Sequence, residues 1–255
     1  IRVRIRGLEF RRVLFRSVTG SPVYAPDDLY QRYGRLDPNG DIVICTTADT
    51  REIQRIATNP KSQFRHLSLS PDGNFVAKLE DGGHLRVWAV ADGRPVLEHE
   101  PIGCTGVAFS HDSRWLAVGQ GDTICRIDLQ TGLEINRWNT AAPVQQLAID
   151  SQDQRIAVAP VRGKTVLIHR AANGQHLAQL PVEAAIPQVL AWHRDGIHLA
   201  VGGSDSRIEI WDIRQPRRIA SLEGHVQRVT DLTFHPQSDL LASYEIGRAS
   251  CRERV

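Results

Sequence analysis

Few residues of this sequence have the types and spacing that catalysis requires. Residues 119–121, GQG, lack the third glycine of a phosphate-binding loop and lead into a predicted strand, where such a loop leads into a helix. No serine nucleophile elbow and no pair of zinc ligands stands out, and the 10 histidines are spread along the chain without clustering. The sequence therefore predicts no catalytic residue, no cofactor and no bound metal.

Two features resemble ligand sites, but each has a simpler interpretation. Residues 37–41, DPNGD, resemble half of a calcium loop and lack the downstream bidentate glutamate that such a loop needs. An Asn-Gly pair between strands is typical of a turn. His169 stands in a predicted strand, with no second histidine or carboxylate at metal-ligand spacing near it. We interpret the first feature as a turn and His169 as a packed or half-exposed strand residue.

Residues 199–213, LAVGGSDSRIEIWDI, have the pattern of a β-hairpin. An apolar run is followed by a polar turn at residues 204–206 and by an alternating run that ends at Trp211-Asp212. One such hairpin is only marginally stable in water, because it has too little surface against which to bury its apolar face. We therefore expect the chain to contain further copies of this unit.

Such copies recur at a regular interval. The features around Asp72 and Trp88 stand 123 positions before those around Asp195 and Trp211, which equals three steps of 41. A small residue that follows an apolar one recurs at intervals of 40 to 43 residues, as Ala77, Ala117, Ala157, Ala200 and Ala242. The sequence is therefore a repeat array.

The repeat resembles that of the WD-repeat β-propellers. Their repeats span roughly 40 to 45 residues and four strands, with Trp-Asp closing one repeat and Gly-His opening the next. Trp211-Asp212 and Gly224-His225 match this order and spacing, and the resemblance covers residues 18–245. It implies an all-β propeller of four-stranded antiparallel blades, with about five to six blades present as an incomplete ring.

Both ends of the chain differ from the repeats. Residues 1–17 contain six arginines and no repeat register, and they resemble translated sequencing-adaptor DNA, as do residues 245–255. We expect both segments to be non-native flanks, which leaves residues 18–244 as a partial propeller. An arginine-rich targeting or nucleic-acid-binding arm is the alternative for residues 1–17.

Without these flanks the chain is mildly acidic. Residues 18–244 hold 22 basic and 26 acidic residues, so the basic pI of the whole chain comes from its ends. This balance gives no reason to expect nucleic acid or a membrane as a partner. Cys45, Cys104 and Cys125 have no paired spacing and are interpreted as reduced core thiols, which favours a cytoplasmic location.

WD-repeat blades are braced by the histidine of Gly-His, a serine or threonine on the second strand, a turn aspartate and the tryptophan. The resemblance implies such structural roles for Trp88, Trp211, Asp205, Asp212, His225 and Ser243. The set is incomplete in every blade. In the fifth blade, for example, Glu183 and Gly203 stand at the histidine and serine positions. We therefore expect packing to hold most blades together.

The resemblance also implies a partner-binding face, formed by residues that precede each first strand and residues just before the turn between the second and third strands. The candidates are Ile102, Arg162, Ile186, Arg228, Asp81, Gln120 and Ser204. We expect Ile102 and Ile186 to be apolar anchors and the two arginines to be polar anchors. The sequence thus predicts a non-catalytic scaffold for protein or peptide partners, monomeric within a larger chain.

Two other functions remain open at this point. The chain could be the sensor or docking domain of a larger enzyme, such as a bacterial serine/threonine protein kinase fused to WD repeats. Residues 128–138, DLQTGLEINRW, also resemble the repeat signature of quinoprotein propellers. Trp138 has no counterpart 40 residues to either side, which makes the quinoprotein interpretation the weaker of the two.

Overall fold

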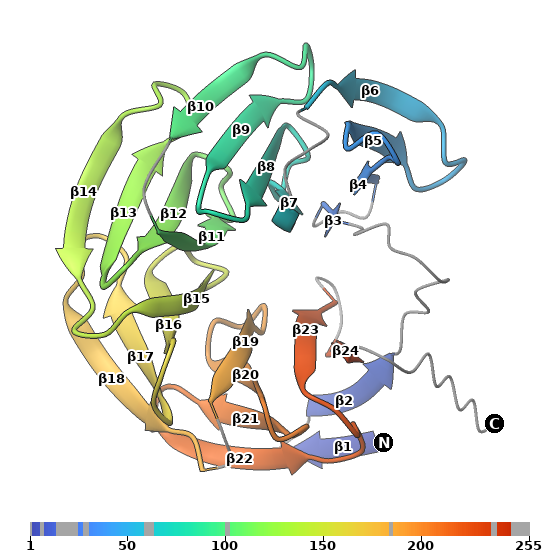
Figure 1. The fold of residues 1–255 in the computed structure, drawn as a ribbon. Helices are drawn as coiled ribbons and strands as arrows, with labels where there is room; N and C mark the ends of the chain where they lie inside the picture. The colour runs from blue at the N-terminus through green and yellow to red at the C-terminus, as the bar shows by residue number, and fades with distance from the viewer. Residues whose placement is uncertain are drawn as a thin grey trace. The chain divides into compact units, whose positions relative to one another are not determined.

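The computed structural model describes residues 2–5, 8–13, 25–27, 31–58, 64–99, 103–183, 186–235 and 239–245. Every helix or strand element within these ranges is a strand, and the strands form four-stranded sheets (Figure 1), which confirms the all-β prediction. In this part of the chain, no helix is long and apolar enough to cross a membrane. The chain divides into two compact units, Ser21–Asn139 and Thr140–Val255, and Ile1–Gly20 belongs to the second.

The Ser21–Asn139 unit, called here the β3–β14 unit, contains three sheets. The first consists of β3 (Ala25–Pro26), β4 (Arg32–Leu36), β5 (Ile42–Thr46) and β6 (Glu52–Ile56). The second consists of β7 (Phe64–Leu69), β8 (Phe75–Glu80), β9 (Leu85–Ala89) and β10 (Pro95–His99), and the third of β11 (Cys104–Phe109), β12 (Trp115–Gln120), β13 (Thr123–Asp128) and β14 (Glu134–Asn139). Neighbouring strands in each sheet are consecutive in the chain and antiparallel, as in a propeller blade.

The β15–β24 unit, which holds Thr140–Val255 together with β1 and β2, has two sheets of the same kind. They consist of β15 (Val144–Ile149), β16 (Arg155–Pro160), β17 (Thr165–Arg170) and β18 (His176–Pro181), and of β19 (Pro187–Trp192), β20 (His198–Gly203), β21 (Ile208–Asp212) and β22 (Arg217–Leu222). All their neighbouring strands are antiparallel. Both sheets therefore repeat the blade pattern of the β3–β14 unit.

A third sheet in the β15–β24 unit has a different order. It pairs β23 (Val229–Phe234) with β24 (Leu241–Glu245), followed by β2 (Leu8–Val13) and β1 (Arg2–Ile5). β2 runs parallel to β24, with Arg12 opposite Leu241 and Val13 opposite Ala242. Part of the segment that we expected to lie outside the blades thus occupies two strand positions, but in an order that the sequence repeat does not have. The boundary at residue 18 itself remains a prediction.

In four of the regular sheets the second strand is buried on both faces, whereas β4 of the first sheet is mostly half-buried. β8, β12, β16 and β20 contain almost continuous runs of buried residues, whereas the outer strands β14, β18 and β22 are mainly exposed. The alanine that marks the repeat lies in these buried strands and is fully covered in the four blades. A small residue at this position lets neighbouring sheets pack closely, and the apolar clusters of the core lie between adjacent sheets of one unit.

A recurring hydrogen bond also joins neighbouring sheets. An Arg32 guanidinium N–H donates to the carbonyl oxygen of Gly73 in the next sheet at 3.2 Å. Arg155 makes the same contact with the carbonyl of Gly196, again 41 residues further along the chain. Each pair lies within one unit, and each ties a second strand to the turn between the first two strands of the following sheet.

Trp88 and Trp211 occupy equivalent positions in their sheets. Trp88 is opposite Val76 and Pro95, and Trp211 is opposite Leu199 and Arg218, so each partner is also displaced by 123 residues. The two indoles are 6% and 3% exposed. Both tryptophans therefore lie at the same position along the third strand. Each side chain is buried against the apolar core next to its own sheet.

Candidate interaction face and a histidine–aspartate cluster

Each regular sheet has one end at which its first strand begins and its second strand ends, called here the candidate end. Antiparallel pairing brings these two points together, because the start of one strand lies opposite the end of the other. The Ser204 backbone N–H donates to the carbonyl oxygen of Ile186 at 3.2 Å, and the Val161 N–H donates to that of Pro143 at 2.8 Å. The two kinds of predicted partner-binding residue therefore lie side by side within a sheet.

The β15–β24 unit presents apolar and basic side chains together at its candidate ends. Ile186 is 38% exposed, and Arg162, Ser204 and Arg228 are also exposed. Val161, beside Arg162, is 38% exposed, and Val226, two residues before Arg228, is 70% exposed. We had not singled out these valines as anchors, although their position next to the candidate arginines was visible in the sequence.

The remaining candidates fall in the β3–β14 unit. Asp81 is exposed in the turn that follows β8, and Gln120 is the half-buried last residue of β12. Both therefore lie at the candidate ends of their own sheets. Ile102 lies outside the described residues, so its role as an apolar anchor remains a prediction.

A buried network holds the loop that carries Val226 and Arg228. His225 Nε2 lies 2.7 Å from Ser243 Oγ, and His225 Nδ1 lies 3.2 Å from Glu245 Oε2. The backbone N–H groups of Val226 and Gln227 donate to the same carboxylate oxygen at 2.7 and 3.0 Å. Burial would raise the pKa of Glu245, but the two N–H donors and His225 outweigh this effect and hold its pKa below the ordinary value.

Glu245 is therefore a bracing residue that the sequence analysis missed. We assigned it to the non-native flank, whereas it is the buried last residue of β24 and accepts both loop N–H groups. The signal for it is the spacing from Ser243, which puts both side chains on the same face of one strand.

In the sheet β19–β22 a glutamate takes part in the bracing. The Trp211 indole N–H donates to Glu209 Oε2 at 3.0 Å, and Glu209 is buried. Arg218 lies 3.5 Å from Glu209 Oε1 and 2.7 Å from Glu183 Oε2. Glu183 thus joins the network through Arg218, while Asp205 and Asp212 accept backbone N–H groups of Arg207 and Arg214 in their own turns.

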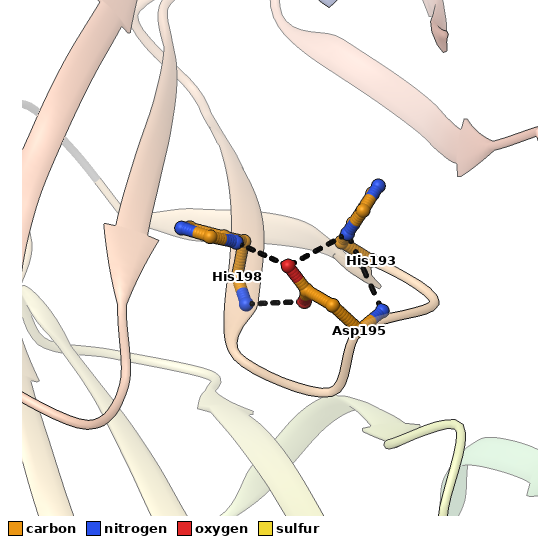
Figure 2. A group of neighbouring side chains, drawn as sticks. All are labelled: His193, Asp195 and His198. Carbon is orange, nitrogen blue, oxygen red and sulfur yellow. Dashed lines mark hydrogen bonds and ion pairs between the residues drawn. The ribbon is translucent and has the colours of Figure 1, made fainter. Parts of the chain in front are cut away.

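A cluster of two histidines and an aspartate lies at the other end of this sheet, in the turn between β19 and β20 (Figure 2). Asp195 Oδ2 lies 3.0 Å from His193 Nδ1 and 2.6 Å from His198 Nδ1, and the three ligand atoms all lie within 4.8 Å of one another. The backbone N–H groups of Ile197 and His198 donate to Asp195 Oδ1. This arrangement corrects our expectation that the histidines do not cluster, and the spacing His-x-Asp-x-x-His was its signal.

The charge state of the aspartate in this cluster follows from its donors. Burial would raise the pKa of Asp195, but hydrogen bonds from His193, His198 and two backbone N–H groups outweigh it and hold the pKa far below its ordinary value. On its other side, His193 Nε2 lies 3.2 Å from Asp239 Oδ1, and the ring packs edge-on against Phe234. The buried His193 ring is therefore fixed from both sides.

Two protein-family models match this chain. The model described as the anaphase-promoting complex subunit 4 WD40 domain matches residues 155–237, and the model described as WD domain, G-beta repeat, matches residues 95–127. The matched stretches contain parts of the regular sheets of both units.

Several proteins are similar to parts of this chain. The anaphase-promoting complex subunit cdc20 of Dictyostelium discoideum is 30% identical over 89 residues, which are 34% of this chain and 18% of that protein. The WD repeat-containing protein slp1 of Schizosaccharomyces pombe is 29% identical over 188 residues, or 71% of this chain and 36% of its own length. Pre-mRNA-processing factor 19 homolog 2 of Arabidopsis thaliana is 26% identical over 148 residues, or 54% and 28%. The chain thus spans about a third or less of these relatives.

Proposed function

We propose, from the premise that this chain belongs to the WD-repeat family of β-propellers, that the candidate ends of its β15–β24 unit bind a protein or peptide partner. The family is generally non-catalytic and serves as a protein-interaction scaffold. The proposal assigns that role here to Val161, Arg162, Ile186, Val226 and Arg228, which we call the docking residues.

The proposal rests on the positions of the exposed apolar side chains. In the described part of the β15–β24 unit, four large apolar side chains are exposed: Val161, Leu177, Ile186 and Val226. Leu177 lies on the outer strand β18, and the other three lie at the candidate ends. Loops on a rigid sheet are common recognition sites, because the scaffold fixes their positions before a partner arrives.

The arginines suggest the chemistry of the partner. Among the residues that the structure describes, neither Arg162 nor Arg228 forms an ion pair, and both side chains are exposed. Arginine is enriched among the residues that contribute most of the affinity of an interface. The docking residues therefore fit a segment that carries apolar side chains next to carboxylates.

The proposal is tested by paired variants of the complete protein. The variant Val226→Ser/Arg228→Glu changes one apolar and one basic docking residue, and Leu177→Ser/Arg214→Glu makes the same chemical changes away from the candidate ends. A partner that co-purifies with the wild-type protein is identified, and its affinity for both purified variants is measured. We expect the first variant to bind at least about tenfold more weakly, which corresponds to about 1.4 kcal/mol.

The control variant should retain the wild-type Kd, and both variants should keep the wild-type unfolding midpoint. Unchanged affinity of Val226→Ser/Arg228→Glu for the partner would reject the assignment of the docking residues. A cytoplasmic location, a monomeric state within a larger chain, and fusion to a kinase remain predictions that this experiment does not address.

A further inference from the structure

Equivalent turns elsewhere in the chain show that the β19–β20 turn can form without two histidines. Ser70 and Asp72 stand 123 residues before His193 and Asp195 in the turn between β7 and β8, and Phe75 stands 123 residues before His198. There, Ser70 Oγ donates to Asp72 Oδ1 at 2.6 Å. The turn between β11 and β12 has the same contact, from Ser110 to Asp112, at 2.7 Å. A serine is therefore sufficient to close this turn, and two imidazoles around the aspartate require another explanation.

The hydrogen bonds of His193 fix where its proton lies. An ionised carboxylate only accepts hydrogen bonds, so the 3.2 Å contact with Asp239 Oδ1 requires a proton on His193 Nε2. The backbone N–H of Asp195 donates to Nδ1 at 3.3 Å, which agrees with a lone pair on that atom. His193 Nδ1 also lies 3.0 Å from Asp195 Oδ2. Either a second proton on the ring or a metal ion between the two atoms makes this contact favourable.

We propose that His193, Asp195 and His198 bind a divalent transition-metal ion, with zinc as the best fit. The two Nδ1 atoms and Oδ2 already converge within 4.8 Å. In a tetrahedral zinc site with bonds of about 2.0 to 2.2 Å, neighbouring ligand atoms are about 3.3 to 3.6 Å apart. Small side-chain rotations that bring all three ligand atoms to this mutual spacing would therefore create the site.

The donor set and its surroundings favour zinc over harder ions. Two imidazole nitrogens and one carboxylate suit zinc, whereas magnesium and calcium prefer oxygen ligands throughout. Asp239 accepts from His193 Nε2, which is the outer carboxylate that orients a metal-bound histidine and increases its basicity. Asp195 and His198 are half-buried, so water can reach the fourth coordination position.

The test exploits the equivalent turn of this chain. The double variant His193→Ser/His198→Phe gives the β19–β20 turn the residues of the β7–β8 turn, and should fold while losing two of the three ligands. Purified, chelator-treated protein is titrated with zinc at neutral pH in competition with a chromophoric chelator. We expect the wild-type protein to bind one zinc ion that the double variant does not bind, and zinc to raise only the wild-type Tm.

A second variant separates metal binding from folding of the turn. Asp239→Asn keeps all three ligands and removes the outer carboxylate, so zinc affinity should fall about 10- to 100-fold. This variant also keeps the test decisive if the double variant does not fold. Equal zinc affinity in the wild-type protein and the double variant would overturn the proposal, as would failure of the wild-type protein to bind zinc at about 100 μM.

Discussion

At the scale of single residues, we expect Trp88 and Trp211, which occupy equivalent positions, to be among the residues least tolerant of substitution. Replacing Trp211 or Trp88 by alanine removes a large side chain from a closed core, and the cavity cannot be filled by its strand neighbours. We expect each substitution to lower the free energy of unfolding by about 3 to 5 kcal/mol. Urea denaturation measures the change.

The matched control for this prediction is Trp138→Ala. Trp138 is only half-buried on the outer strand β14, so its loss should cost less than half as much. A loss below about 1 kcal/mol for Trp211→Ala would show that this indole does not contribute to the core as the structure describes.

What could be predicted at this scale depended on whether a residue type recurs. Trp88 and Trp211 share one residue type and one register, so the repeat identified both as structural. Glu209 does not match the family's bracing set, and its contact with Trp211 joins side chains two positions apart on one strand. Such a contact needs the actual side-chain directions, which the pattern of residue types does not contain.

At the scale of the turn that joins two strands, the β5–β6 turn carries avoidable strain. Thr50 in the β5–β6 turn has a φ of 55°, whereas the β9–β10 turn places Gly93 at the equivalent position with a φ of 70°. A left-handed conformation costs a residue with a Cβ roughly 1 to 2 kcal/mol, and this cost is only partly offset by the greater flexibility of glycine in the unfolded chain. We expect Thr50→Gly to stabilise the protein by about 1 kcal/mol in urea denaturation.

The reciprocal substitution, Gly93→Thr, is the control. A Cβ on Gly93 would lie 3.0 Å from Gln54 Nε2, so this change should destabilise the protein by about 1 to 2 kcal/mol. Destabilisation by Thr50→Gly would contradict a strain-based account of this turn.

Strands and turns within a repeat were predictable because both are encoded locally. The buried second strands, the tight turns and the exposed outer strands all follow from patterns shorter than one repeat. The sheet that joins β24 to β2 was not predictable in this way, since residues 1–17 lack the repeat register and pair with residues more than two hundred positions away. Long-range pairing of unlike segments leaves no periodic signal.

At the scale of the whole molecule, carboxylates in both units link folding to pH. Hydrogen bonds from the Thr131 backbone N–H and hydroxyl lower the pKa of Asp128. Burial would raise the pKa of Asp72, but donors that include Ser70, Asn74 and Ser113 outweigh it and lower the pKa. Glu245 has a lowered pKa in the β15–β24 unit for the reasons given above. Each of these groups stabilises the fold only while it is ionised.

The sign of the pH dependence follows from these lowered values. A carboxylate whose pKa is lower in the folded state contributes its full stabilisation above the unfolded pKa, about 3.9 for Asp and 4.3 for Glu, and loses it as the pH falls through the folded pKa. We therefore expect the Tm to be steady above about pH 6 and to fall progressively below about pH 5.

Glu245→Gln isolates one contribution to this acid sensitivity. The amide oxygen can still accept from Val226 or Gln227, but it carries no charge to attract His225, so the variant should have a lower Tm at neutral pH. Because glutamine does not titrate, the difference between variant and wild type should shrink as the pH approaches 3.5, below the ordinary pKa of about 4.3. Glu223→Gln, an exposed carboxylate in the same unit, should follow the wild-type curve, and Glu245→Gln curves parallel to wild type at every pH would contradict this role.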